Sequence, residues 1–182
     1  MPGMAEPIDF GLGDAEINRS EANRILTSGK IIETTPLGVL MWGHDEIACI
    51  DSKAKRIRYY AALKNGRLAN FAVTQVAVWR DNSARETRGL PQRVIFDHIL
   101  KKWPVIISDY LQTERGKAFW ENLMGEAVAE GFQIAVTHLV DNTILWFDPT
   151  TDRDLSSWVS EWRGAWGYQS DHQNFRFIIS QK

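Results

Sequence analysis

Apolar and polar residues follow two different rhythms along this chain. In the first half, short apolar runs separated by turn-forming residues are typical of β-strands. They predict an antiparallel meander with Asn65-Gly66 as a hairpin turn. An irregular N-terminal arm and a short helix over residues 14–27 precede the meander. The predicted strands cover residues 39–42, 46–51, 56–63 and 68–80.

In the second half, helical spacing alternates with short apolar runs. Pro91 suits the first turn of a helix whose apolar positions lie on one face. Residues 105–108 are almost entirely apolar, as expected for a strand that is buried on both faces. The predicted helices cover residues 91–102, 113–130 and 154–166, and the predicted strands cover 105–108, 132–137, 143–147 and 175–180. The expected fold class is α+β, with a mixed but mostly antiparallel central sheet flanked by helices.

Length and composition bound the class of protein. The chain has 182 residues, 44% of them apolar and 24% charged, which suits one domain with a substantial core. We expect that domain to comprise an N-terminal arm and helix over 1–36, a core over 37–150, and a C-terminal helix and strand over 151–182. The net charge of −2 argues against nucleic acid as a partner.

The single cysteine excludes an internal disulfide and fits a reducing compartment. Cys49 lies in an apolar, strand-like run, where a small core residue is the simpler interpretation than a nucleophile. There is no basic and apolar leader, and no apolar run approaches the roughly 18 residues that span a bilayer. We therefore expect a cytoplasmic protein with no membrane partner.

The segment after the long strand carries the most specific chemistry. An arginine-rich loop there ends in Arg88-Gly89-Leu90-Pro91, where a helix is predicted to begin. The backbone N–H groups of a first helical turn point at an anion, and the helix dipole favours negative charge. Arginine forks add charge-assisted bonds to phosphate oxygens. The loop therefore predicts a phosphate site, with Arg80, Arg85 and Arg88 as its basic residues.

The order of these elements resembles the GNAT (Gcn5-related N-acetyltransferase) superfamily. A meander, a long strand, a phosphate-binding loop, a helix, a buried strand, a helix and a closing hairpin occur in that order over residues 37–150. In the family, the loop of pattern Arg/Gln-x-x-Gly-x-Gly/Ala holds the pyrophosphate of acetyl-CoA. Here Gly89 takes the first glycine position, whereas Glu86 and Pro91 depart from the pattern. The segment from Ile106 to Trp120 also looks like small GNAT-like proteins of bacteriophages.

The resemblance implies a function and a set of site residues. It implies a GNAT-like acyltransferase that transfers an acetyl or other acyl group from acyl-CoA to an amine. Backbone groups of the long strand would pair with the pantetheine, and residues of the loop would bind the pyrophosphate. The implied cofactor-binding residues are Val76, Ala77, Val78 and Trp79 on the strand and Arg85, Arg88, Gly89, Leu90 and Gln92 at the loop.

Three residues at the end of the buried strand are candidates for catalysis. Asp109 is the candidate general base, although an aspartate at a strand end is also a common turn former or helix cap. Ser108 could orient a substrate or bond the backbone. The family often uses a tyrosine of the following helix as general acid, and Tyr110, just before that helix, is the nearest substitute in this chain.

Other sites receive less support. His44, His98, His138 and His172 show no ligand spacing with each other or with Cys49, so no metal is expected.

The alternative function is a non-catalytic protein on the same scaffold, which engages and modulates a host protein if the chain is phage-encoded. The helix over 154–166, with Trp158 and Trp162 four residues apart, could pack on the sheet or on a second copy in a homodimer.

Overall fold

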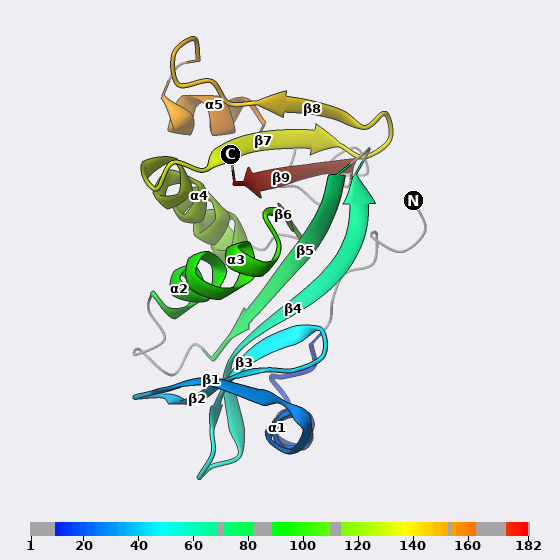
Figure 1. Ribbon diagram of the computed structural model, residues 1–182, viewed down its shortest axis with the longest axis vertical. Coiled ribbons are helices and arrows are strands. Elements are labelled where there is room, and N and C mark those ends of the chain that lie inside the picture. The colour runs from blue at the N-terminus through cyan, green and yellow to red at the C-terminus, as the bar shows by residue number, and fades with distance from the viewer. Residues whose placement is uncertain are drawn as a thin grey trace. The chain divides into compact units, whose positions relative to one another are not determined.

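The computed structural model describes residues 10–68, 71–81, 89–109, 114–152, 154–162 and 174–181. Figure 1 shows helices and a large sheet, so the protein is α+β, as predicted. The helical elements are α1 (Ala15–Ser28), α2 (Leu90–Val94), the π-helix η2 (Ile95–Ile99), α3 (Leu100–Lys102), α4 (Glu114–Ala129) and α5 (Leu155–Glu161). The strands are β1 (Lys30–Thr35), β2 (Gly38–Trp42), β3 (Glu46–Asp51), β4 (Arg56–Leu68), β5 (Phe71–Arg80), β6 (Val105–Ser108), β7 (Gln133–His138), β8 (Thr143–Trp146) and β9 (Phe175–Ser180).

Within the described residues, the nine strands form one sheet in the order β1-β2-β3-β4-β5-β6-β9-β7-β8. The strands β1 to β4 are successive antiparallel neighbours. This confirms the predicted meander for β2, β3 and β4, whereas β1 was not predicted. The last strand, β9, lies between β6 and β7 and is antiparallel to both. Its place in the sheet was not predicted, because hydrophobic spacing identifies a strand without naming its neighbours.

The chain divides into two compact units. The N-terminal unit comprises Ile8–Lys64 and Val76–His98, and the C-terminal unit comprises Asn65–Gln75 together with Ile99–Lys182. The long strands β4 and β5 contribute residues to both units.

In the N-terminal unit, α1 packs on β2 and β3. Asp14 caps the helix by accepting hydrogen bonds from the backbone N–H groups of Glu16 and Ile17. The helix buries Ala22 and Ile25 against the apolar face of the sheet. Other members of this core are Leu12, Met41, Ala48, Ile50 and Ile57.

One buried polar residue ties α1 to the sheet. Asn18 donates from Nδ2 to the carbonyl oxygens of Leu12 (3.0 Å) and Ile57 (3.3 Å). Its Oδ1 accepts from the backbone N–H of Ile57 at 2.7 Å. The register between β3 and β4 shifts between Cys49 and Ile50, opposite this point, so Asn18 supplies hydrogen bonds where the ladder is irregular.

The predicted hairpin turn at Asn65-Gly66 is wrong. Both residues lie inside β4, which continues to Leu68. The strand extends because Leu68 is buried with Val73 in the core of the C-terminal unit. Asn65 also accepts a hydrogen bond from Thr74 Oγ1 on β5 at 2.8 Å. Strand pairing and burial therefore override the local turn preference.

The predicted helix after Gly89 is confirmed, and it contains a π-helical segment. The helical run extends through α2, η2 and α3, from Leu90 to Lys102. The four apolar positions predicted to share a face, Val94, Ile95, Ile99 and Leu100, are all buried. A π-helical turn holds one residue more than an α-helical turn, and such turns are frequent at functional sites.

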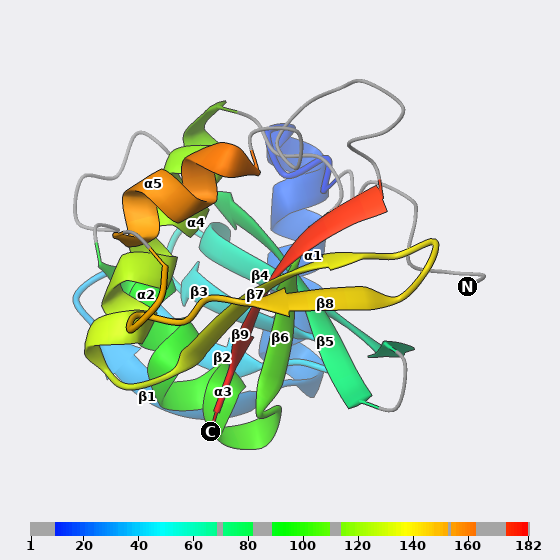
Figure 2. The ribbon, with the colours of Figure 1, turned by 90° about the horizontal axis from the view of Figure 1, so that it is seen from above.

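In the C-terminal unit, residues of five strands form the core. Leu68, Val73, Ile107, Ala135 and Ile178 are its buried members. The helix α4 packs on β7 and on α5, and Figures 1 and 2 show α5 beside α4. The predicted tryptophan stripe is present: the rings of Trp158 and Trp162 lie 6.3 Å apart, although α5 ends at Glu161. None of the described helices is both long and apolar enough to cross a membrane.

Candidate functional site

The loop that follows β5 is only partly within the described residues. Arg85 and Arg88, the predicted pyrophosphate-binding cations, lie outside them. At the end of the loop, Gly89 has a left-handed backbone (φ +75°) and precedes the first residue of α2. A Cβ atom at Gly89 would meet nothing within 4 Å, so the backbone conformation is what favours glycine there.

The first turn of α2 is built as predicted from Pro91. Leu90 and Pro91 are buried, and Gln92 is partly exposed. Arg93 forms an ion pair with Glu33 of β1, with 2.9 Å between Nη2 and Oε1. Glu33 could not be identified from the sequence, because β1 was not predicted and the two residues are 60 positions apart.

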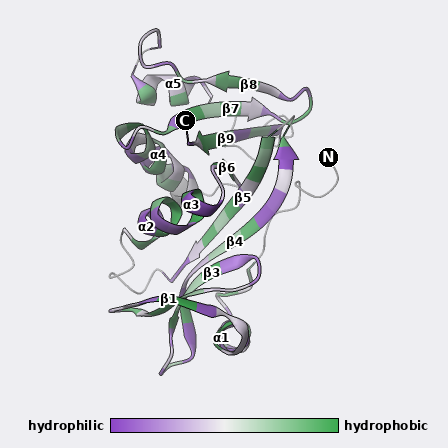
Figure 3. Ribbon diagram, in the orientation of Figure 1, coloured by the Kyte–Doolittle hydropathy of each residue, from purple (hydrophilic) through white to green (hydrophobic). Residues whose placement is uncertain are grey.

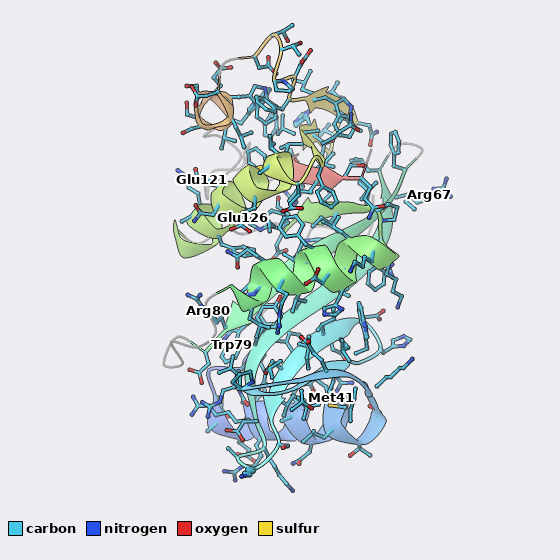
Figure 4. The ribbon with its side chains drawn as sticks, turned by 60° about the vertical axis from the view of Figure 1, so that its left-hand side comes forward. Met41, Arg67, Trp79, Arg80, Glu121 and Glu126 are labelled. Carbon is cyan, nitrogen blue, oxygen red and sulfur yellow. The ribbon has the colours of Figure 1, made fainter. Side chains whose placement is uncertain are left out.

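The four strand residues implied to contact the cofactor lie on β5 in the N-terminal unit. Val76 and Ala77 are buried, whereas Val78 and Trp79 are partly exposed. Trp79 packs against the core beneath α1, and Figure 4 shows its side chain next to Arg80 at the end of the strand. Any role of this segment in binding an extended ligand would therefore use mainly its backbone.

A charged network fixes the chain where the loop leaves β5. The buried Asp81 accepts hydrogen bonds from Arg58 Nη1 (3.0 Å) and lies 3.0 Å from Arg56 Nη2. Arg58 Nη2 also donates to Asp51 at 3.1 Å. Burial lowers the pKa of Arg58, but its hydrogen bonds to Asp51 and Asp81 outweigh this and raise the pKa above the ordinary value. The two arginines, two positions apart on β4, were the available signal, since such residues share a face of a strand.

In the C-terminal unit, Asp109 is held by a buried amide. Gln75, which is only 1% exposed, donates from Nε2 to Asp109 Oδ1 at 2.6 Å. No described group donates a hydrogen bond to the other amide atom, Oε1, although that atom is buried. Asp109 could be identified from the sequence but Gln75 could not, because a glutamine in an apolar strand gives no spacing signal.

Asp109 belongs to a polar row across the sheet of this unit. The antiparallel register pairs Ile107 of β6 with Ile178 of β9 and, continued by two residues, sets Asp109 across from Arg176. Arg176 in turn pairs with Thr137 of β7, and both are buried. Residues opposite each other share a face. The row therefore places a carboxylate and a guanidinium on neighbouring strands of the C-terminal unit.

Of the other two catalytic candidates, Ser108 and Tyr110, the structure describes only Ser108. Ser108 is buried, and its Oγ accepts a hydrogen bond from the backbone N–H of Phe177 at 3.0 Å. Of the two roles considered for Ser108, orienting a substrate or bonding the backbone, this geometry accounts for bonding the backbone. Tyr110 lies outside the described residues.

The described residues can also be examined for metal ligands and for a reactive thiol. Among the described residues, no group of three or more His, Cys, Asp or Glu side chains is placed to hold a metal ion. Cys49 is buried beside Thr35, and burial raises the pKa of its thiol. The arrangement can chiefly transfer a proton at Asp109 and bind a hydrogen-bond donor at Gln75.

No protein-family model matches the chain, and neither a curated protein nor a solved structure is significantly similar to it.

Proposed function

We propose that this protein is a GNAT-like N-acyltransferase that transfers an acetyl or other acyl group from acyl-CoA to an amine. The observation that carries the proposal is the pair of Gln75 and Asp109. A fixed carboxylate can take a proton, and the buried Oε1 of Gln75 is an acceptor that an N–H group would satisfy. Both are what an amine substrate requires.

The order of elements supports the same proposal. The long strand β5 is followed by a loop, a glycine with positive φ, a helical run that starts at Leu90, and the apolar strand β6. In the sheet, β6 is the neighbour of β5. The phosphates of acyl-CoA are assigned to Arg85, Arg88, Gly89, Leu90 and Gln92, and its pantetheine to the backbone of residues 76–79.

For the proposed reaction, the protein must mainly hold the thioester beside the amine and supply one proton acceptor. The amine nitrogen attacks the thioester carbon, the new C–N bond forms, and the C–S bond breaks. The electron pair leaves with the CoA thiolate, and the proton of the amine passes to Asp109 and then to water. A backbone N–H of β5 is the proposed donor to the oxyanion.

The first test is thermal denaturation with acetyl-CoA, CoA or ATP. A ligand that binds only the native state raises the melting temperature by mass action. We expect acetyl-CoA and CoA to raise it and ATP not to. Arg88→Glu is expected to abolish the rise, whereas Arg19→Glu, the same charge reversal on the exposed face of α1, is expected to preserve it.

The second test is turnover, measured as thiol release from acetyl-CoA with a panel of amines. Asp109→Asn is expected to slow release by about 10²-fold or more while the protection by acetyl-CoA persists. No protection by CoA or acetyl-CoA at millimolar concentration would overturn the proposal.

A non-catalytic binding protein on this scaffold is the second candidate function. The observation that favours it is the exposure of Leu145 and Trp146 on β8, since exposed apolar residues can anchor a partner. Protection by acetyl-CoA without thiol release with any amine would favour this candidate over the enzyme.

A further inference from the structure

The strand β8 ends the sheet of the C-terminal unit and leaves one side of its backbone unpaired among the described residues. It pairs with β7 on the other side, and the N–H of Phe147 donates to Ile134 at 2.9 Å. Hydrogen-bonded pairs alternate along an antiparallel ladder. The N–H and C=O groups of Ile144 and Trp146 therefore point away from β7.

The side chains around this edge are apolar and exposed. Leu145 is 50% exposed and Trp146 is 42% exposed, and Val140 in the preceding turn is exposed as well. Figure 3 shows hydrophobic residues along β8 next to a hydrophilic turn. Natural edge strands usually carry a lysine, another charge or a proline that discourages pairing with a further strand. The four residues of β8, Thr-Ile-Leu-Trp, carry none of these.

Acidic residues flank the strand at both ends. Asp141 and Asp148 are exposed, and each is held ionised by hydrogen bonds from the chain. Bonds from the backbone and side chain of Thr143, and from His138, lower the pKa of Asp141 to about 2. Bonds from Thr150 lower the pKa of Asp148.

The surrounding sequence is acidic too. From Ala118 to Asp152 the chain contains no lysine or arginine. The same stretch contains Glu121, Glu126, Glu130, Asp141, Asp148 and Asp152. An unpaired edge strand can bind a second copy of the same chain or a segment of another protein. The excess of acidic residues around β8 distinguishes between these two partners.

A second copy of the chain fits this edge poorly. If two β8 strands paired antiparallel through these outward groups, Leu145 of one copy would lie opposite Leu145 of the other, and Asp141 of one copy would lie next to Asp148 of the other at each end. Like charges brought close together across an interface are destabilising. A strand with basic residues at its ends would instead place opposite charges there.

We propose that β8 binds an extended segment of another protein as an added antiparallel strand, and that this segment has apolar residues at its centre and lysine or arginine at both ends. The outward N–H and C=O groups of Ile144 and Trp146 pair with its backbone. Leu145 and Trp146 contact its apolar side chains, and Asp141 and Asp148 face its basic ends. This mode is β-strand addition, in which the backbone supplies affinity and the side chains supply selectivity. The inference does not depend on the proposed acyltransferase activity.

Fluorescence anisotropy with labelled peptides tests the proposal directly. The probe is Lys-Lys-Val-Thr-Val-Thr-Val-Lys-Lys, and its comparison peptides replace the four lysines by glutamates or carry N-methyl groups on alternate central residues. We expect the lysine peptide to bind at least about tenfold more tightly than either comparison peptide at 0.15 M salt. Equal binding of the N-methylated peptide would overturn strand addition.

A matched pair of double variants tests the place of binding. Asp141→Asn with Asp148→Asn removes both charges but keeps side-chain oxygens that can accept the turn hydrogen bonds. Glu121→Gln with Glu126→Gln removes two charges from the exposed side of α4, where Figure 4 labels both residues. The first double variant is expected to weaken binding of the lysine peptide at least about fivefold and the second to leave it unchanged. Equal effects of the two would overturn the assignment to β8.

The alternative occupant is tested by sedimentation. Leu145→Lys places a charge on the exposed side of β8. A wild-type dimer that becomes a monomer in Leu145→Lys would assign the edge to a second copy and overturn the proposal. A wild-type monomer that binds the lysine peptide, with binding lost in Leu145→Lys, would support it.

Discussion

The amide of Gln75 on β5 donates to the carboxylate of Asp109, immediately after β6, across 2.6 Å. Gln75 is almost completely buried, so this bond fixes the orientation of the carboxylate. The two residues are 34 positions apart in the chain, but the strands β5 and β6 are neighbours in the sheet.

Replacing Gln75 by glutamate is expected to make stability depend on pH. The variant places two carboxylates at the distance of a hydrogen bond, and they cannot both ionise at low cost. At least one of them then has a folded-state pKa above its unfolded-state pKa, so the destabilisation appears as pH rises through that range. We expect Gln75→Glu to unfold at lower urea concentration than wild type at pH 7 and to recover most of the difference at pH 4.5.

Gln75→Met provides the control without charge. It loses the bond to Asp109, but it also removes the buried Oε1, to which no described group donates, so the expected loss is about 1 kcal/mol with little dependence on pH. A pH dependence as strong in Gln75→Met as in Gln75→Glu would contradict the role of the second carboxylate.

Replacing Asn18 by leucine is expected to destabilise the protein by about 2–4 kcal/mol, because it leaves buried backbone groups of Leu12 and Ile57 without their partner. The measurement is equilibrium urea unfolding followed by far-UV circular dichroism. Ser20→Ala, on the exposed face of the same helix, is expected to change stability by no more than about 0.5 kcal/mol. A loss below about 1 kcal/mol for Asn18→Leu would show that water replaces the amide.

The thiol of Cys49 is expected to react slowly in the native state. It is buried beside Thr35, and burial raises its pKa, so little thiolate is available. With a thiol-reactive disulfide reagent at pH 8, we expect the native rate to be at least about 10²-fold below the rate in guanidinium chloride. Comparable rates in the two conditions would mean that β3 opens readily.

The turn after β7 is expected to lose stability only in strong acid. Hydrogen bonds from Thr143, followed by that from His138, lower the pKa of Asp141 to about 2. A depressed folded-state pKa contributes stability that is fully present above the unfolded pKa near 4 and is lost as pH falls towards 2. Carboxyl ¹³C chemical shifts measured between pH 1.5 and 6 follow this titration. Thr143→Val is expected to raise the pKa of Asp141, and an unchanged value would contradict the assigned cause.

Local patterns predicted most elements because their causes are local. Pro91 in a first helical turn, the buried face of the helix that follows it, and the apolar run of β6 depend on spacing within a few residues. The exception among local signals is Asn65-Gly66, whose turn preference is weaker than the pairing and burial that extend β4.

The parts of the site that escaped prediction depend on contacts between distant residues. Asp109 could be identified because it ends a strand, whereas Gln75 gains its role only from the neighbouring strand. Arg176 likewise could not be predicted, because it lies beside Asp109 and Thr137 only through the insertion of β9 between β6 and β7. Arg93 and Glu33 likewise meet only because the chain folds back on itself.

The π-helical segment Ile95–Ile99 holds one residue more than an α-helix needs for the same turn. Removing one residue there, such as the exposed Asp97, would restore regular α-helical winding. The flanking residues would keep nearly the same rotation about the helix axis, so Leu90 and Val94 would stay on the face that buries them. A deletion inside the regular helix α4 would instead rotate everything before it by about 100° relative to everything after it. Chains of this fold should therefore tolerate the loss of one residue in the π-helical segment far better than the loss of one residue in α4.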